Sequence, residues 1–133
     1  MTDTHRIPQP EGYAIRVHPR PQYLADQSDP ERGRYAFAYV ITIVNEGEHT
    51  AQLVSRHWYI TNAAGEVTEV TGEGVVGEQP ILVPGERYTY TSGAVLETPY
   101  GTMHGSYQMV GADGTRFDAA IPAFALVIPQ MLH

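Results

Sequence analysis

Length and composition indicate one globular domain: the chain has 133 residues, 42% of them hydrophobic and 17% charged, which is too few charges for intrinsic disorder. The absence of cysteine excludes disulfide scaffolds, thiolate zinc sites, iron–sulfur clusters and cysteine nucleophiles, and it fits a reducing compartment. The net charge of −7 comes from 15 acidic and 8 basic residues, all of the latter arginine, without the basic stripe of a nucleic-acid-binding domain, so we expect no nucleic-acid partner.

Export and membrane signals are not expected in this sequence. Residues 1–10 are polar, with two prolines and without the apolar core of a signal peptide. The most apolar stretch, residues 119–128, contains Pro122 and has about ten residues, whereas a helix needs ~20 to cross a bilayer. We therefore expect a cytoplasmic protein that does not associate with membranes.

Alternation of apolar and polar residues, many of them β-branched or aromatic, predicts strands along most of the chain. Residues 19–33 are polar and rich in proline, and we expect a loop with one helical turn there. Residues 72–84 are punctuated by glycine and proline and are expected to form a connection between strands. The expected strands are residues 12–18, 34–45, 51–61, 66–71, 86–96, 102–110 and 115–121, with tight turns at residues 45–48, 62–65 and 111–114.

Two of these strands make specific predictions about burial. The strand at residues 34–45 has large side chains on one face and small or β-branched ones on the other, so we expect both faces to be covered. In the next strand we expect Val54, Trp58 and Ile60 to lie on one face together.

No segment keeps a 3.6-residue period, so the sequence predicts an all-β protein. About seven to eight short strands are typical of an antiparallel β-sandwich of the immunoglobulin or fibronectin type III kind, with a small barrel as the alternative. We expect residues 12–128 to form this single domain, preceded by a flexible segment at residues 1–11 and followed by a tail at residues 129–133.

The segment Gly72-Glu73-Gly74-Val75-Val76-Gly77 matches the G-x-G-x-x-G pattern of dinucleotide-binding proteins. That pattern works when a helix begins after the glycines and its N-terminus receives the pyrophosphate. Pro80 follows too soon for such a helix. The sequence therefore predicts a structural loop between strands, with an anion-binding nest of backbone N–H groups as the alternative. The carboxylates of Glu73 and Glu78 argue against the nest, because they would repel phosphate.

Arg56 and His57 are the candidate side chains for an anion or carboxylate, on one open face of the sheet. The alternative is that they are ordinary polar neighbours of a buried Trp58. The hypothetical site for pyrophosphate or another anion comprises Gly72, Gly74, Gly77, Arg56 and His57.

Neither a metal centre nor a catalytic site is predicted. The six histidines lack metal-binding spacing, and we expect no metal site and no cofactor, although Glu46, Glu48 and His49 could hold a hard cation loosely at one turn. Ser55 and His57 lie two residues apart on a strand, but no orienting acid or nucleophile elbow accompanies them. We therefore predict no enzymatic activity.

Several stretches together resemble the ApaG family: Arg56-His57-Trp58, residues 74–80, Tyr90-Thr91-Ser92-Gly93, residues 101–103 and residues 105–110. The similarity extends over about residues 13–124. It implies a fibronectin type III-like β-sandwich without established catalytic activity, found alone in bacteria and as a module in some eukaryotic F-box and polymerase-interacting proteins. It also implies a link to cobalt and magnesium handling, a gene neighbourhood that includes a diadenosine tetraphosphate hydrolase, and a glycine motif interpreted as a pyrophosphate site.

Three functions remain open at this point. The first is a non-catalytic module that binds an unidentified protein partner through an exposed face or edge of the sandwich. The second is a small-ligand binder that takes pyrophosphate or a dinucleoside polyphosphate at residues 72–77. The third is a sensor of divalent cations. A homodimer is compatible with each of them.

Overall fold

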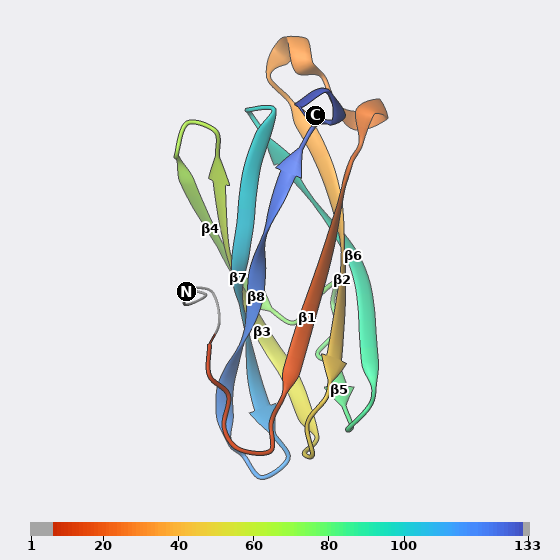
Figure 1. Ribbon diagram of the computed structural model, residues 1–133, viewed down its shortest axis with the longest axis vertical. Coiled ribbons are helices and arrows are strands. Elements are labelled where there is room, and N and C mark those ends of the chain that lie inside the picture. Colours follow the sequence, from red (N-terminus) through yellow and green to blue (C-terminus); the bar gives the residue numbers. More distant parts are fainter. Residues whose placement is uncertain (1–6, 132–133) are drawn as a thin grey trace.

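The computed structural model describes residues 7–131 as eight β-strands in two antiparallel sheets (Figure 1). This confirms the predicted all-β sandwich. The three-stranded sheet has the order β1-β2-β6, formed by Ile15–Tyr23, Tyr35–Asn45 and Arg87–Leu96. The larger sheet has the order β4-β3-β7-β8, formed by Val67–Glu73, Ala51–Asn62, Tyr100–Gly111 and Arg116–Val127, and the short β5 (Ile81–Leu82) also pairs with β3. Three short 3-10 helices are η1 (Ala25–Gln27), η2 (Pro30–Arg32) and η3 (Pro129–Met131).

The core lies between the sheets and takes alternate residues from each strand. In β2 the large side chains of one face are buried, and Ile41 and Ile43 are fully enclosed. The opposite face of β2 is mostly half-buried, because the described residues form no further layer outside it. The prediction that both faces are covered is therefore wrong.

A β-bulge in β3 changes which residues face the core. The pairing of β3 with β7 shifts register between Leu53 and Ser55, which places Leu53 inside and leaves Val54 half-buried. Trp58, beyond the bulge, is buried as predicted. The prediction that Val54 shares the face of Trp58 is wrong because one extra residue reverses the alternation of a strand.

Two segments that were predicted to be loops, residues 19–33 and 72–84, partly form β-strands. β1 continues through Pro19 and Pro21 to Tyr23, so the loop predicted from residue 19 begins later. Proline is tolerated there because β1 pairs only with β2, and an edge strand needs ladder bonds on one side only. The connection at residues 72–84 contains the end of β4 and the two residues of β5.

The predicted domain limits stay a prediction. The sandwich strands span residues 15–127, and residues 1–6 and 132–133 lie outside the described part of the chain. Upstream of β1, the Gln9 side-chain amide forms two hydrogen bonds, of 2.7 and 2.8 Å, with the backbone of Ile15. Among residues 7–131 there is no helix with the length and apolar character to cross a membrane.

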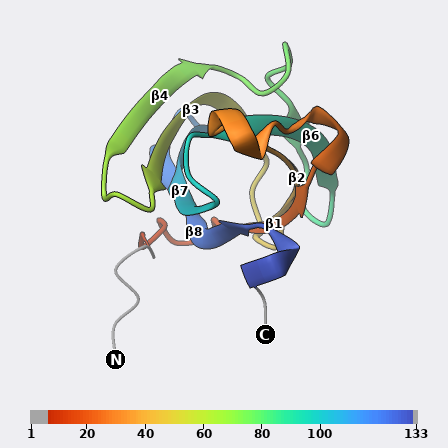
Figure 2. The same cartoon turned by 90° about the horizontal axis from the view of Figure 1, so that it is seen from above.

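The two sheets meet differently on the two sides of the sandwich. On one side β1 and β8 lie next to each other, in front of the core in Figure 1 and along the lower edge of the ring in Figure 2. On the other side β6 is the last strand of its sheet, whereas the opposing sheet continues past β3 to β4. The chain after β4 crosses this second side on its way to β5 and β6 (Figure 2). We call it the open side.

Candidate binding site on the open side of the sandwich

The glycine segment, residues 72–78, forms a tight turn rather than the start of a helix. Val75 and Glu78 exchange backbone hydrogen bonds of 2.8 and 3.0 Å, and the two residues between them have φ angles of +48° (Val76) and +80° (Gly77). Positive φ at both central positions defines a type I′ turn. The Gly74 N–H donates to the Val54 carbonyl at 2.8 Å. The N–H groups of Gly74, Val75 and Glu78 are therefore bound within the protein, which leaves fewer donors for an anion nest.

Two glycines of this segment leave room for other atoms. A side chain at Gly74 would collide with the carbonyl oxygen of Glu78. A side chain at Gly72 would lie 2.7 Å from the guanidinium of Arg56. These glycines let the segment lie closely over β3 and over the Arg56 side chain.

Arg56 points inward from β3, on the same side as Trp58, and holds the glycine segment. Its Nη1 donates to the carbonyls of Glu73 (3.0 Å) and Gly74 (2.8 Å). Within residues 7–131 no carboxylate forms an ion pair with this guanidinium. The half-buried charge is thus balanced by backbone dipoles alone, and it favours the approach of an anion.

A recess of about 210 Å³ opens beside Arg56. Its inner walls are buried side chains, among them Trp58 (3% exposed) and Val75 (1%), whereas Val76 at its rim is 65% exposed. The recess combines aromatic and aliphatic walls with one cation, two phenols and two aliphatic hydroxyls. The complete lining is Tyr39, Arg56, Trp58, Val75, Val76, Tyr90, Thr91 and Ser92.

Behind the recess, two buried tyrosines join the sheets. The hydroxyls of Tyr90 in β6 and Tyr107 in β7 lie 2.5 Å apart. Burial raises the pKa of Tyr90 to about 12, and burial likewise raises the pKa of Tyr107. The positive charge of Arg56 opposes both shifts in part. Both phenols are therefore neutral at physiological pH and act as hydrogen-bonding groups.

His57 lies on the opposite face of the sheet from Arg56, because consecutive residues of a strand alternate. Its Nε2 is 2.7 Å from a carboxylate oxygen of Glu69, and its ring stacks on Tyr59 at 4.6 Å between centroids. Tyr59 also stacks on His104 at 5.1 Å. The structure therefore brings Arg56 to Gly72 and Gly74 but places His57 in a separate cluster on the outer face.

The other residues of interest have structural partners. Glu46 lies 3.7 Å from Arg16, and residues 7–131 contain no group of three or more ligand side chains suited to a metal ion. Ser55 donates to the side-chain oxygen of Gln108, and Gln108 donates in turn to Ser106, at 2.8 and 3.0 Å. The cation-binding turn and the pair of Ser55 and His57 receive no support from this arrangement.

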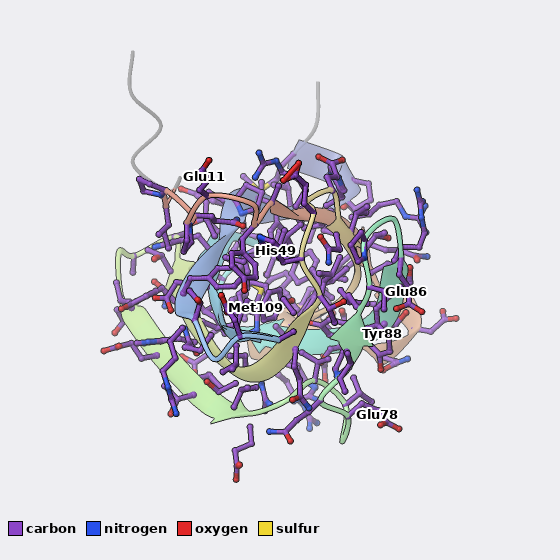
Figure 3. The ribbon with its side chains drawn as sticks, turned by 90° about the horizontal axis from the view of Figure 1, so that it is seen from below. Glu11, His49, Glu78, Glu86, Tyr88 and Met109 are labelled. Atoms are coloured by element: carbon purple, nitrogen blue, oxygen red, sulfur yellow. The ribbon has the colours of Figure 1, made fainter. Side chains whose placement is uncertain are left out.

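Further along the open side, a second hollow of about 400 Å³ lies between the β3–β4 hairpin and the end of β6. Val67 and Val95 are 58% and 50% exposed on its walls, and Glu66 and Glu97 are exposed at its rim. The full lining is Ile60, Asn62, Glu66, Val67, Thr68, Val95, Leu96 and Glu97. The side chain of Glu78, by contrast, points away from the molecule at its periphery (Figure 3).

Comparison with known proteins agrees with this geometry. The model of the ApaG domain matches residues 25–111. The chain belongs to the ApaG family. A protein named Protein ApaG from Dechloromonas aromatica is 57% identical over all of both chains, and one from Aromatoleum aromaticum is 58% identical over 92% of this chain and 97% of its own. A crystal structure of a Bordetella pertussis protein superposes with a TM-score of 0.88 at 48% identity, covering 91% of this chain and 98% of that one.

Family membership confirms the resemblance noted in the sequence, and the structure adds how its parts are placed. Three of the stretches that resemble the family lie far apart in the sequence but meet at one recess. They contribute, among others, Arg56, Val75 and Tyr90. Sequence reasoning missed most of the lining residues. One signal in the sequence could have found them: Tyr90-Thr91-Ser92-Gly93 is among the stretches that resemble the family, although no role was assigned to it.

Proposed function

We propose that this protein is a non-catalytic binding module that receives an extended segment of a partner protein as an added strand along β6, on the open side. The observation that carries this proposal is the unequal width of the two sheets. Among residues 7–131, only the larger sheet extends to the open side with a further strand, so β4 overhangs and no described strand of the smaller sheet lies opposite it. A strand paired with β6 would fill that place.

The exposure of β4 supports this assignment. Every residue of β4 except Gly72 is exposed. Val70 pairs with Trp58 and faces the same side of the sheet, yet Val70 is 37% exposed and Trp58 only 3%. Strands of a sandwich normally bury the face that points to the other sheet, so the inward face of β4 lacks its cover.

The exposed edge of β6 is closed at both ends by other parts of the chain. At one end the glycine segment crosses the open side beside Thr91 and Ser92. At the other end the backbone N–H of Ala63 donates to the Thr98 hydroxyl at 3.0 Å, which ties the β3–β4 hairpin to the chain after β6. The exposed length of β6 between these closures suits an extended segment of roughly six residues.

The side chains around the second hollow indicate which partner segments would bind along β6. The half-buried Ile60 favours apolar side chains on the inward face of the added strand, and Val95, which points outward from β6, favours an apolar residue on its outer face. Glu66 and Glu97 at the rim favour lysine or arginine near that end of the segment. We therefore expect a partner segment with alternating apolar residues and a basic beginning.

A peptide library displayed with free C-termini tests the proposal. We expect selected peptides to bind the wild-type protein and to lose about tenfold or more in affinity with Val95→Lys, measured by fluorescence polarisation, because the new charge would lie next to an apolar residue on the outer face of the added strand. The matched control is Val83→Lys, since Val83 is also 50% exposed but lies outside both hollows.

Backbone pairing and self-association are tested with the same peptides. N-methylation of alternate peptide amides should abolish binding in one of the two registers, because an added strand depends on its N–H groups. Selection of no peptide, or equal weakening by Val83→Lys and Val95→Lys, would contradict the proposal. A dimer in sedimentation experiments that Val95→Lys dissociates would also contradict it, since the occupant would then be a second copy of the chain.

The second candidate is a binder of pyrophosphate or a dinucleoside polyphosphate at Gly72, Gly74 and Gly77. The observation in its favour is that Arg56 has no carboxylate partner within the described part of the chain. Its test is a pyrophosphate titration followed by the amide chemical shifts of the three glycines. The link to cobalt and magnesium that the family resemblance implies does not enter the proposal, because residues 7–131 offer no cluster of ligand side chains.

A further inference from the structure

We propose that the recess beside Arg56 is a subsite for the C-terminal residue of the bound segment: its carboxylate pairs with the Arg56 guanidinium and its apolar side chain occupies the recess. This inference rests on the proposed function, because it assigns the end of the added strand. It differs in kind from the pyrophosphate hypothesis, since the ligand group is a single carboxylate on an apolar residue.

The direction of the added strand leads to this end. Every strand pair in the structure is antiparallel. β6 runs from Arg87 towards Leu96, so an antiparallel partner would enter opposite Leu96 and finish opposite Thr91 and Ser92. These two residues line the recess. The end of the segment that reaches Arg56 is therefore its C-terminus.

The glycine segment favours a chain end over a continuing chain. It crosses the open side at this point and is fixed by the hydrogen bonds of Gly74 to Val54 and of Arg56 to Glu73 and Gly74. A longer partner chain would meet this barrier. A segment that stops there needs a partner for its terminal carboxylate, and Arg56 is the cation within the recess.

The walls of the recess fit an apolar side chain next to that carboxylate. Trp58, Tyr39 and Val75 contribute buried apolar surface, and Thr91 and Ser92 contribute hydroxyls on the β6 side. A volume of about 210 Å³ exceeds the ~150 Å³ of a protein cavity known to hold a benzene molecule, so a leucine-sized side chain is within its capacity.

Charge near the recess favours a monoanion. The exposed side chains of Glu73 and Glu78 belong to the glycine segment itself. Their repulsion of a ligand and the attraction by Arg56 both grow in proportion to the ligand's charge, and two negative side chains against one positive side chain make additional ligand charge unfavourable. A single carboxylate gains the contact with Arg56 at the smallest repulsive cost.

N-acetyl-leucine, with N-acetyl-leucinamide as the matched neutral ligand, tests the subsite without the rest of the peptide. We expect saturable chemical-shift changes for the amides of Val75, Val76, Thr91 and Ser92 with the acid, and at least about tenfold weaker binding of the amide. Binding of the acid should fall as the pH drops below about 3.5, where its carboxyl group becomes protonated. Equal binding of acid and amide, or tighter binding of pyrophosphate than of the acid, would overturn the proposal.

Variants of Arg56 and Arg87 test whether N-acetyl-leucine binds at the recess. Arg56→Gln should abolish the shifts caused by N-acetyl-leucine, whereas Arg87→Gln, which makes the same change of charge at an exposed position of β6, should not alter them. If Arg56→Gln does not fold, Arg56→Lys serves, with binding weakened about tenfold because lysine lacks the planar fork of donors. Unchanged affinity in the folded Arg56 variant would refute the assignment.

The two proposals can fail separately. Displayed peptides that bind at Val95 but have equal affinity as free acids and as amides would leave the strand-addition function in place and refute the subsite. If N-acetyl-leucine binds at Arg56 but no longer peptide binds, strand addition is refuted, and the recess remains a site for a free apolar carboxylate rather than for the end of an added strand.

Discussion

Gly74 and Gly77 both have positive φ angles, +62° and +80°, but their surroundings differ. At Gly74 a β-carbon would collide with the Glu78 carbonyl, whereas at Gly77 it would meet nothing within 4 Å. We expect Gly74→Ala to lower the free energy of unfolding by about 3 kcal/mol, because strain and collision add. Gly77→Ala should cost about 1 kcal/mol from backbone strain alone. Urea denaturation of both variants measures the difference, and equal losses would show that close packing at Gly74 does not matter.

Sequence reasoning at this scale identified the glycines but not their separate roles. It correctly removed the helix expected of a dinucleotide-binding fingerprint, because Pro80 is visible in the sequence. The need for glycine at residue 72 comes from Arg56 on a neighbouring strand, and that neighbour is fixed by pairing across 16 residues of chain. Local patterns do not contain this information.

The turn between β2 and β3 depends on Asn45, the one buried polar residue in the described part of the chain. Its amide nitrogen donates to the carbonyls of His49 and Leu82, both at 2.9 Å, and its oxygen accepts from the Gly47 N–H at 2.9 Å. Asn45→Ala would remove all three hydrogen bonds, of which the one to the Leu82 carbonyl is buried and the other two are partly buried. We expect it to lower the free energy of unfolding by about 3 kcal/mol.

Asn62 provides the matched control in the turn between β3 and β4. Its side-chain oxygen accepts hydrogen bonds from the N–H groups of Ala64 and Glu66, but this turn is exposed and water can replace the lost partner. Asn62→Ala should therefore cost about 1 kcal/mol or less, measured by the same denaturation. A similar loss for both variants would contradict the importance of burial at Asn45.

At the level of elements, the sequence predicted the strands better than their ends and faces. The hairpins at residues 62–65 and 111–114 form as expected, because their turn residues are local signals. The bulge at Leu53 and the extension of β1 through Pro19 and Pro21 were missed. The bulge is a shift in the register between β3 and β7, and the prolines fit because β1 pairs on one side only, so both features depend on neighbouring strands that lie elsewhere in the sequence.

The hydrogen bond between Tyr90 and Tyr107 connects the two sheets of the whole molecule and makes its stability depend on pH. A tyrosine in the unfolded chain has a pKa near 10.0, whereas burial raises the pKa of Tyr90 to about 12 and also raises that of Tyr107. Between these values the folded state holds protons that the unfolded state has lost. The contribution of the two tyrosines to the free energy of unfolding is therefore fully present below pH 10. It falls as the pH rises towards 12, by about 1.4 kcal/mol per pH unit for each tyrosine.

Urea denaturation at several pH values between 9 and 12 measures this slope. The double variant Tyr90→Phe with Tyr107→Phe should lose most of the decline above pH 10, whatever its stability at neutral pH. Tyr100→Phe is the control, because Tyr100 is 42% exposed and its phenol remains in contact with water. An alkaline decline that the double variant retains in full would show that other groups cause it.

The sequence by itself determined the all-β class, the positions of most strands, the absence of a helix after the glycines of residues 72–77 and the resemblance to the ApaG family. These conclusions depend on alternation, turn residues and short motifs, all of which act over a few neighbouring residues. Only the tertiary structure decided that β4 overhangs the smaller sheet, that Arg56 and His57 occupy opposite faces, and that Arg56, Val75 and Tyr90 share one recess. The physical reason is that these arrangements depend on the order in which distant strands pair, and that order is set by burial of the whole core rather than by any one segment.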